Sequence, residues 1–226
     1  MKRILYVVPT RGRPDHAVAL AAAWRETTDD AELVFALDQD DLTLADYVRV
    51  ADRISPAWMR SSDTHSMVES LNRAAMIYAE RYEYIGFMGD DHRPRTPHWD
   101  SIIYDRMRLD SLILAYGNDL VQGPNLPTAV LMRSDAILTL GQMAPQSLTH
   151  LYVDNYWLRL GRDSGRMAYV PEVVIQHEHP ITGKVPWTEG HKRVNEGSMY
   201  ERDRRAFELY EAGGYMHEDV LKVKDL

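Results

Sequence analysis

The chain has 226 residues and a formal net charge of −8, with 45% hydrophobic and 27% charged residues. This is the balance of an ordinary folded domain with a sizeable core, and the negative charge excludes a non-specific nucleic-acid binder, which needs a basic surface. The absence of cysteine excludes disulfides and thiolate chemistry and fits a reducing cytoplasm. We expect no signal peptide, and no apolar run reaches the roughly 18 residues of a membrane span.

The first half of the chain alternates between strands and helices. The predicted elements are a buried strand at 4–8, a helix capped by Asp15, a buried strand at 33–37, a helix at 43–54, a helix opened by Ser66 in a capping box, and a buried strand at 84–88. This order predicts an α/β fold in which helical crossovers join the strands of a parallel sheet.

The second half is less regular. The predicted elements are a helix at 99–109, turns at 117–118 and 123–125, a strand at 128–132, a helix at 134–140, a short segment at 156–160 closed by Gly161, a strand at 173–175, a polar segment at 181–197 and a final helix at 199–210. In the final helix, Arg202, Arg204 and Arg205 are expected to form a solvated face.

Polar clusters follow the predicted strands at 10–13, 38–41, 89–92 and 177–179. Carboxyl ends of parallel strands point the same way, so the first three clusters should converge on one crevice. In the first, Arg11 and Arg13 and the free N–H groups of a helix N-terminus suit a phosphate or diphosphate, although a solvated basic turn is the alternative.

The acidic residues at the second and third strand ends suggest two different uses. Asp38 and Asp40 can accept hydrogen bonds from a base N–H or a ribose hydroxyl, although the acids at 40–41 can equally cap the next helix. Adjacent Asp90 and Asp91 repel one another unless a cation lies close, and Asp91 is the preferred metal ligand. The alternative is an acidic surface turn.

Two histidines follow the last predicted strand. His177 and His179 alternate along an extended chain, so both point to one face, and either one can complete a metal site with Asp91.

Together, the Pro-Thr-Arg-Gly-Arg-Pro loop at 9–14, the acidic end of the second strand and the Gly-Asp-Asp-His stretch at 89–92 resemble a GT-A-fold glycosyltransferase. More narrowly, they resemble the small family-2-like enzymes of bacteria and phages, over roughly residues 3–180. The resemblance implies a GT-A-like, mostly parallel central sheet with flanking helices. It also implies a nucleotide-sugar-binding half at 1–92, an irregular acceptor-side half at 93–180, and a C-terminal loop or lid and helix at 181–226 packed on the same domain.

The function that the resemblance implies is metal-dependent transfer of a sugar from a nucleoside-diphosphate donor to an acceptor hydroxyl on a glycan, a protein or a modified base. Mn²⁺ or Mg²⁺ would be held by Asp91 of the DXD-type motif and by His177 or His179, of which His179 is preferred. Gly89 stands where the family's first aspartate usually lies, so Asp90 is expected to take over its ribose contact. A phage-encoded protein would act in the host cytoplasm.

The remaining site residues also come from the resemblance. The expected donor-binding residues are Pro9, Thr10, Arg11, Arg13, Asp38, Asp40, Asn72 and Asp90. Asp154, at the start of a later helix, matches the catalytic base of inverting members, although Val153 replaces the acid that usually precedes it; the alternative role of Asp154 is a helix N-cap. Lys184, Lys192 and Arg193 of the lid can steady the diphosphate.

Two other classes of protein compete with this reading. A non-catalytic, degenerate module that binds a nucleotide sugar or a glycan would explain the departures at Gly89 and Val153. A sugar-phosphate nucleotidyltransferase would share the fold and the metal, but its first loop is normally rich in glycine, and here the loop has only Gly12. Within the main hypothesis, a retaining mechanism stays open.

Overall fold

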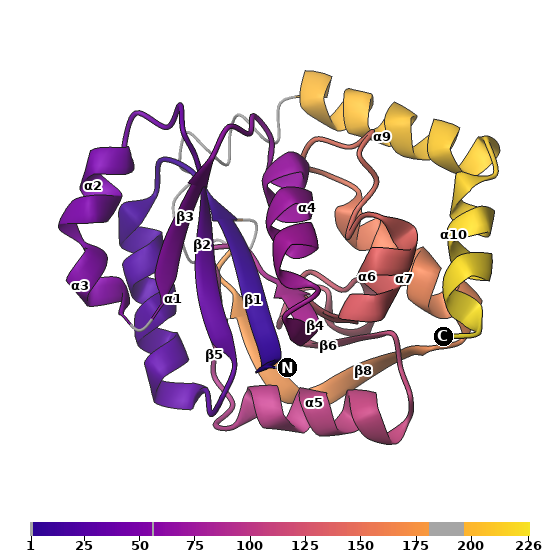
Figure 1. Cartoon of the computed structure of the whole chain (residues 1–226), viewed down its shortest axis with the longest axis horizontal. Coiled ribbons are helices and arrows are strands. Elements are labelled where there is room, and N and C mark those ends of the chain that lie inside the picture. Colours follow the sequence, from indigo (N-terminus) through magenta and orange to yellow (C-terminus); the bar gives the residue numbers. More distant parts are fainter. Residues whose placement is uncertain (1, 56, 181–196) are drawn as a thin grey trace.

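The apolar run near the N-terminus forms strand β1 (Lys2–Thr10) of the computed structural model, which describes residues 2–55, 57–180 and 197–226. The other described strands are β2 (Glu32–Asp38), β3 (Trp58–Ser62), β4 (Tyr82–Phe87), β5 (His92–Pro94), β6 (Leu114–Asn118), β7 (Val130–Arg133) and β8 (Met167–His177). They form one sheet in the order β3-β2-β1-β4-β7-β6-β8-β5 (Figure 1).

The sheet is mostly parallel. Strand β1 pairs in parallel with β2 and β4, β2 with β3, and β6 with β8, while β7 and β5 run against their neighbours. The predicted α/β class with a mostly parallel sheet is therefore confirmed. Strands β1, β2 and β4 end at the same edge, where the sequence places its first three polar clusters.

Helices cover both faces of the sheet (Figure 1). The described helices are α1 (Pro14–Thr27), α2 (Leu44–Arg49), α3 (Ala51–Ile54), α4 (Met67–Tyr78), α5 (Trp99–Leu109), α6 (Ser134–Leu140), α7 (Val153–Ser164), α9 (Gly197–Ala212), α10 (Tyr215–Lys224) and the 3-10 turn η1 (Gly123–Asn125). Alternate side chains of β1 enter two different cores, because successive strand residues point to opposite faces. Leu5 and Val7 belong to a core that includes residues of α4, α6, α7, α9 and α10, whereas Tyr6 belongs to a core that includes residues of α1, α2, α3 and α5.

A close approach in the second core explains a glycine in a central strand. The Tyr6 ring lies 5.5 Å from the ring of Trp24 and 5.0 Å from that of Trp99, so it is held on two sides. A Cβ atom built on Gly86 of β4 would lie 2.3 Å from the Tyr6 ring. Glycine is thus the residue that lets β4 lie beside β1 at this point.

Several predicted element boundaries differ from those observed. Strands β3 and β6 and helix α10 are not predicted from the sequence, and the helix predicted at 43–54 is broken into α2 and α3. Asp15 lies in the first turn of α1, whose N-cap is Arg13, so it is not the cap. Helix α7 runs through Gly161 and ends at Ser164, and its C-cap Gly165 has a left-handed φ of 71°.

The predicted start of α4 is confirmed. Ser66 is its N-cap, and its hydroxyl accepts a hydrogen bond from the backbone N–H of Glu69 at 3.1 Å. The Glu69 carboxylate in turn accepts from the backbone N–H of His65 at 2.9 Å, one residue before the donor of a standard capping box.

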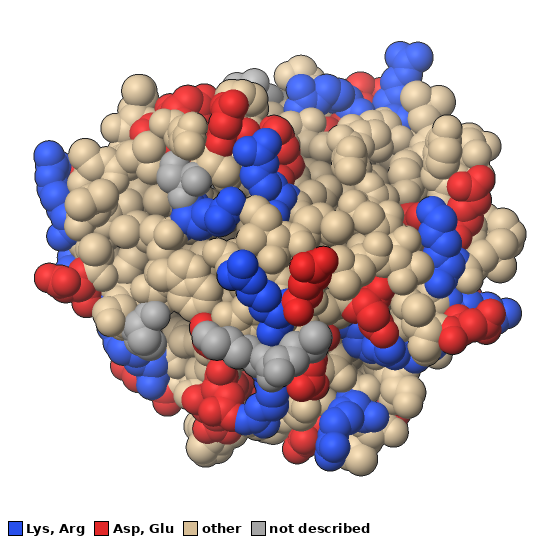
Figure 2. All heavy atoms as spheres, in the orientation of Figure 1, with Lys and Arg blue, Asp and Glu red and all other residues tan. Residues whose placement is uncertain are grey.

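The predicted lid, with Lys184, Lys192 and Arg193, lies outside the described residues. On the face shown in Figure 2, acidic and basic side chains are intermixed rather than gathered into a broad basic area. None of the described helices has both the length and the apolar composition needed to cross a membrane.

Candidate functional site

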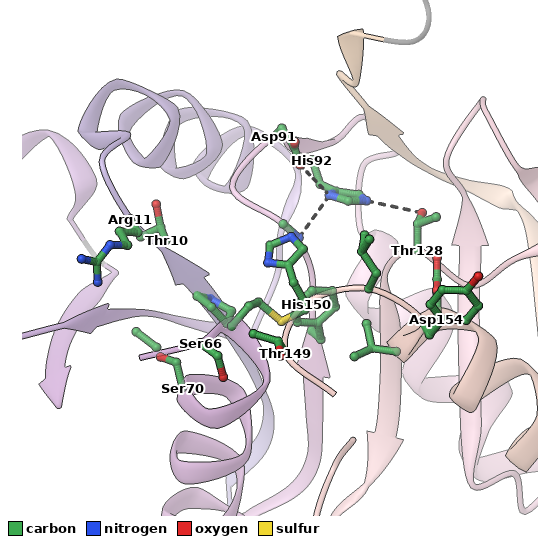
Figure 3. Close-up of a pocket in the computed structure, with 18 of the residues that line it drawn as sticks. Thr10, Arg11, Ser66, Ser70, Asp91, His92, Thr128, Thr149, His150 and Asp154 are labelled. Carbon is green, nitrogen blue, oxygen red and sulfur yellow. Dashed lines mark hydrogen bonds and ion pairs between the residues drawn. The ribbon is translucent and has the colours of Figure 1, made fainter. Parts of the chain in front are cut away.

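A cavity of about 630 Å³ lies at the edge of the sheet where β1, β2 and β4 end (Figure 3). Its described lining includes most of the residues selected from the sequence: Pro9, Thr10, Arg11, Arg13, Asp38, Asp40, Asp91, Asp154, His177 and His179. The clusters at the first three strand ends thus do meet in one place, as the parallel arrangement predicts.

The loop after β1 is tied to the acidic residues around it. Thr10 donates a hydrogen bond from Oγ1 to Asp90 Oδ2 at 2.5 Å. An Arg11 Nη1 atom lies 3.0 Å from Asp38 Oδ2 and also contacts Asp40. An Arg13 Nη2 atom lies 2.5 Å from Asp90 Oδ1. Both guanidinium groups are therefore paired with carboxylates, so a bound diphosphate would have to share them.

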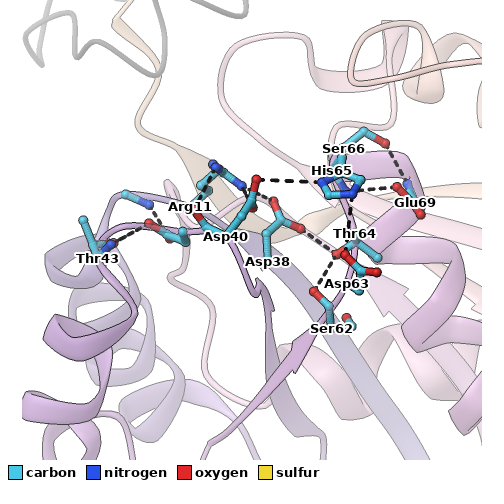
Figure 4. Close-up of polar contacts among 12 residues, drawn as sticks. Arg11, Asp38, Asp40, Thr43, Ser62, Asp63, Thr64, His65, Ser66 and Glu69 are labelled. Carbon is cyan, nitrogen blue, oxygen red and sulfur yellow. Dashed lines mark hydrogen bonds and ion pairs between the residues drawn. The ribbon is translucent and has the colours of Figure 1, made fainter.

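The acids after β2 have separate partners (Figure 4). The Asp38 carboxylate is buried and accepts from Thr64 Oγ1 at 2.6 Å as well as from Arg11. Asp40 is exposed, and its hydrogen bond with Arg11 lowers the pKa of its carboxyl group. Asp41, rather than Asp40, orders the start of the next helix, since it accepts from the backbone N–H of Thr43 at 2.8 Å.

The two aspartates after β4 face different surroundings. Asp90 is fully buried between Thr10 and Arg13, and burial raises the pKa of its carboxyl group to about 6. The Asp90 side chain is absent from the described lining of the cavity, whereas Asp91 is part of it. The position of Asp90 therefore does not support the ribose contact that is expected of it. Asp91 is the member of the pair that a ligand in the cavity can reach.

Asp91 lies beside two imidazole rings. Its Oδ1 atom is 3.5 Å from His177 Nε2 and 3.3 Å from His92 Nδ1. The ligand atoms of these three residues all lie within 4.8 Å of one another, close enough to hold one metal ion. A carboxylate is a ligand of the type that Mn²⁺ and Mg²⁺ prefer, and a neutral imidazole nitrogen is the commonest metal ligand in proteins. His179 lines the same cavity, with its ring 5.1 Å from that of His177.

Sheet pairing explains how His92 and His177 meet. They are register partners on the antiparallel strands β5 and β8, and their rings stack at 4.1 Å with an interplanar angle of 17°. The Nδ1 atom of His92 accepts from the backbone N–H of Gly89 at 3.1 Å. Burial, followed by the nearby His177, lowers the pKa of His92 to about 4. The ring of His92 is therefore neutral at pH 7 and is oriented against His177.

Asp154 lies on the other side of the cavity, in the first turn of α7 (Figure 3). The N-cap of this helix is Tyr152, with a φ of 66°, so Asp154 does not have the capping role that is its alternative. Its Oδ1 atom accepts from the backbone N–H of Asn155 at 2.9 Å, and burial raises the pKa of its carboxyl group. Such a carboxylate in a cavity is a reasonable proton acceptor.

Asn72 is not among the described residues that line the cavity, although it is expected to bind the donor. Its Oδ1 atom accepts from the backbone N–H groups of Met143 and Ala144 at 2.9 and 3.0 Å, and its Nδ2 atom donates to the Ala144 carbonyl oxygen at 2.8 Å. All of these contacts hold the loop after α6. The structure thus places Asn72 as a buried structural residue on the core side of α4.

Other cavity residues are not recognised from the sequence. Ser70 of α4 presents a buried hydroxyl with no hydrogen-bond partner in the described part of the chain, and His150 and Arg202 also line the cavity. Ser70 lies one helical turn after the cap residue Ser66, which is a local signal that could have identified it. His150 and Arg202 have no local signal, because their place depends on the packing of α9.

No protein-family model matches the chain, and no curated protein sequence matches it. Solved structures do match. S. aureus TarS residues 1–349 in complex with UDP-GlcNAc aligns with a TM-score of 0.61 at 11% identity, over 94% of this chain and 75% of that one. The mannosyltransferase PcManGT from Pyrobaculum calidifontis, in complex with GDP-Man and Mn²⁺, aligns with a TM-score of 0.61 at 12% identity, over 94% and 76%.

A third structure is glucosyl-3-phosphoglycerate synthase from Mycobacterium tuberculosis in complex with Mn²⁺, UDP and glucosyl-3-phosphoglycerate. It aligns with a TM-score of 0.57 at 14% identity, over 80% of this chain and 74% of that one. Against a longer S. aureus TarS structure, the chain spans only 43% of that protein's length. These similarities confirm the expected GT-A fold.

Proposed function

We propose that the protein is a metal-dependent glycosyltransferase that moves a sugar from a nucleoside-diphosphate donor to an acceptor hydroxyl. The observation that carries the proposal is the meeting of Asp91 and His177 in a cavity that also receives the loop after β1. Three solved structures with the same fold hold UDP-GlcNAc, GDP-Man with Mn²⁺, and UDP with Mn²⁺, which supports a donor of this class.

The metal would be Mn²⁺ or Mg²⁺, held by Asp91 and His177, with His179 beside them, and the Mn²⁺ in two of the matching structures supports this choice. When bound, such an ion supplies charge stabilisation for the diphosphate that leaves. His92 holds the ring of His177 in place through the stack between them. We prefer His177 to His179, because the Nε2 atom of His177 lies 3.5 Å from Asp91.

The donor would lie along the strand ends. Pro9, Thr10 and Arg11 line this part of the cavity together with Asp38, whose buried carboxylate is fixed by Thr64 and can accept a further hydrogen bond. Arg11 and Arg13 can each turn part of their N–H groups toward a diphosphate while they keep a carboxylate partner.

Asp154 would act as the base of an inverting reaction. The acceptor oxygen forms a bond to the anomeric carbon, the bond from that carbon to the diphosphate breaks, and the hydroxyl proton passes to the Asp154 carboxylate. The raised pKa of this group makes it a stronger base than an exposed aspartate. General-base help of this kind contributes about 10²–10⁴-fold to a rate.

The test is thermal melting of the purified protein with Mn²⁺ and each of UDP, GDP, dTDP, CDP and ADP. A diphosphate present at 100 times its dissociation constant stabilises the native state by about 2.7 kcal/mol, so one tight ligand should stand out. Asp91→Asn should abolish the metal-dependent shift. Asp219→Asn is the matched control, since Asp219 is also a buried acid but holds Tyr156 and Tyr210 rather than the cavity.

A shift that Asp219→Asn keeps and Asp91→Asn loses would establish the donor site. Release of diphosphate from the matching sugar nucleotide would then establish an enzyme, and the anomer of the product would tell inversion from retention. Binding without any turnover would instead indicate a nucleotide-sugar-binding module. If none of the five diphosphates raises the melting temperature, the proposed donor site is contradicted.

A further inference from the structure

A buried carboxylate of α9 holds a loop that lines the cavity. Asp203 has no exposed surface, and its Oδ1 atom accepts from the backbone N–H of Thr149 at 3.2 Å. Its Oδ2 atom accepts from the backbone N–H groups of His150 and Leu151, both at 2.8 Å. One side chain near the C-terminus thus gathers three consecutive amides of the loop between α6 and α7.

The same loop is held from two more directions. The Thr149 carbonyl oxygen accepts from the backbone N–H of Val68, in the first turn of α4, at 3.2 Å. The ring of Tyr152 stacks on Phe207 of α9 at 5.7 Å, and its backbone has a φ of 66°. A residue with a side chain seldom adopts this conformation unless its surroundings impose it. The loop is therefore specified by α4 and α9 together.

The position of this loop decides the geometry of the proposed reaction. Figure 3 places His150 between the side of the cavity with Thr10 and Arg11 and the side with Thr128 and Asp154. The loop leads directly into α7, which carries Asp154 in its first turn. A shift of the loop would move the base relative to Asp91, and misplacement by about 1 Å can cost on the order of 10²-fold in rate.

We infer that Asp203 is a positioning residue that sets the loop carrying His150 and, through that loop, the place of Asp154. The inference rests on the proposed glycosyl transfer. A carboxylate suits the task because it is acceptor-only and offers both oxygens to three converging N–H donors. Asparagine at this position would keep the shape, but it would turn an NH₂ group toward one of the N–H groups.

The chain offers a matched control in α5. Asp100 is also buried, and it accepts from the backbone N–H groups of Asp29, Asp30 and Ala31 at 3.0, 2.9 and 2.9 Å. The loop that it holds does not line the described cavity. Asp100→Asn and Asp203→Asn therefore remove the same kind of interaction, one away from the cavity and one beside it.

The experiment compares the two variants with the unchanged protein. Each variant is measured for melting temperature, for amide hydrogen exchange in peptides that cover residues 149–151, and for release of diphosphate from UDP-GlcNAc and from GDP-mannose with Mn²⁺. We expect both variants to melt earlier. Only Asp203→Asn should raise exchange at 149–151 by tenfold or more and lower kcat by tenfold or more, with the KM for the donor within twofold.

Equal loss of kcat in both variants would overturn the inference, because the effect would then reflect general destabilisation. Unchanged exchange at 149–151 in Asp203→Asn would overturn it as well. If the unchanged protein releases no diphosphate from either probe, the proposed transfer fails for these two donors. The exchange measurement, with the NMR signals of the His150 ring in the two variants, would still decide whether Asp203 positions the loop.

Discussion

Asn72 gives a specific prediction, because it is expected from the sequence to bind the donor, whereas in the structure it holds the loop after α6. Asn72→Ala would remove the acceptor for the backbone N–H groups of Met143 and Ala144 and the donor to the Ala144 carbonyl oxygen. Each of these bonds contributes about 1 kcal/mol net, and a buried group left without a partner costs about 1–3 kcal/mol.

For three bonds in a loop that partly relaxes, we expect the free energy of unfolding to fall by roughly 3–5 kcal/mol. In a chain of this length each 1 kcal/mol lowers the melting temperature by about 2–4 °C, so the fall should be roughly 6–20 °C. Asn125→Ala, at an exposed site in η1, should change the unfolding free energy by less than about 0.5 kcal/mol.

The assay is urea unfolding of both variants, followed by diphosphate titration well below their melting temperatures. We expect Asn72→Ala to keep the dissociation constant of the nucleoside diphosphate within about threefold. A tenfold weaker affinity with an unchanged unfolding free energy would refute this reasoning and restore the donor-binding role predicted from the sequence.

Three further predictions concern the cavity and the sheet. Ser70→Ala should weaken the binding of a diphosphate or a sugar nucleotide by about threefold to tenfold in calorimetry, which is the value of one hydrogen bond. Ser134→Ala also removes a buried hydroxyl that has no partner among the described residues, but this hydroxyl lies outside the cavity lining, so binding should be unchanged. Equal affinities of the two variants would show that the Ser70 hydroxyl does not contact the ligand. A base works in its deprotonated form and burial raises the pKa of Asp154, so kcat should rise with pH, with a midpoint above the ordinary aspartate pKa of about 3.9. This rise should disappear from the pH profile of Asp154→Asn. A rise that persists in the variant would belong to another group. Gly86→Ala would push a Cβ atom into the ring of Tyr6 and should lower the free energy of unfolding, measured by urea unfolding, by about 1–3 kcal/mol or more. An unchanged free energy of unfolding would mean that the ring can move.

The central part of the fold could be predicted because its signals are local. The continuous apolar runs of β1, β2 and β4 predict buried strands. The start of α4 is predicted by Ser66 and Glu69, two capping residues only three positions apart. Strand β6 is harder, because its short apolar segment has the composition of a buried helix as much as that of a strand.

The candidate site could be predicted only in part, since several of its contacts join distant segments. The pairing of His92 with His177 depends on the register of β5 and β8, and the contact of Asp203 with the loop before α7 spans some 50 residues. Asn72 is a related case. Its contacts with the loop after α6 depend on tertiary packing, in which the side chain satisfies buried backbone groups, and the sequence carries no local signal for them.

The opposite orientations of Asp90 and Asp91 have a consequence for mutagenesis. The first acid anchors the loop after β1 from inside the protein, while the second faces the space in which a ligand would lie. A double substitution meant to inactivate the acidic motif would therefore combine two different defects, a loosened scaffold and a lost ligand contact. Loss of activity in such a protein would say little about chemistry, whereas the single change at Asp91 separates the two.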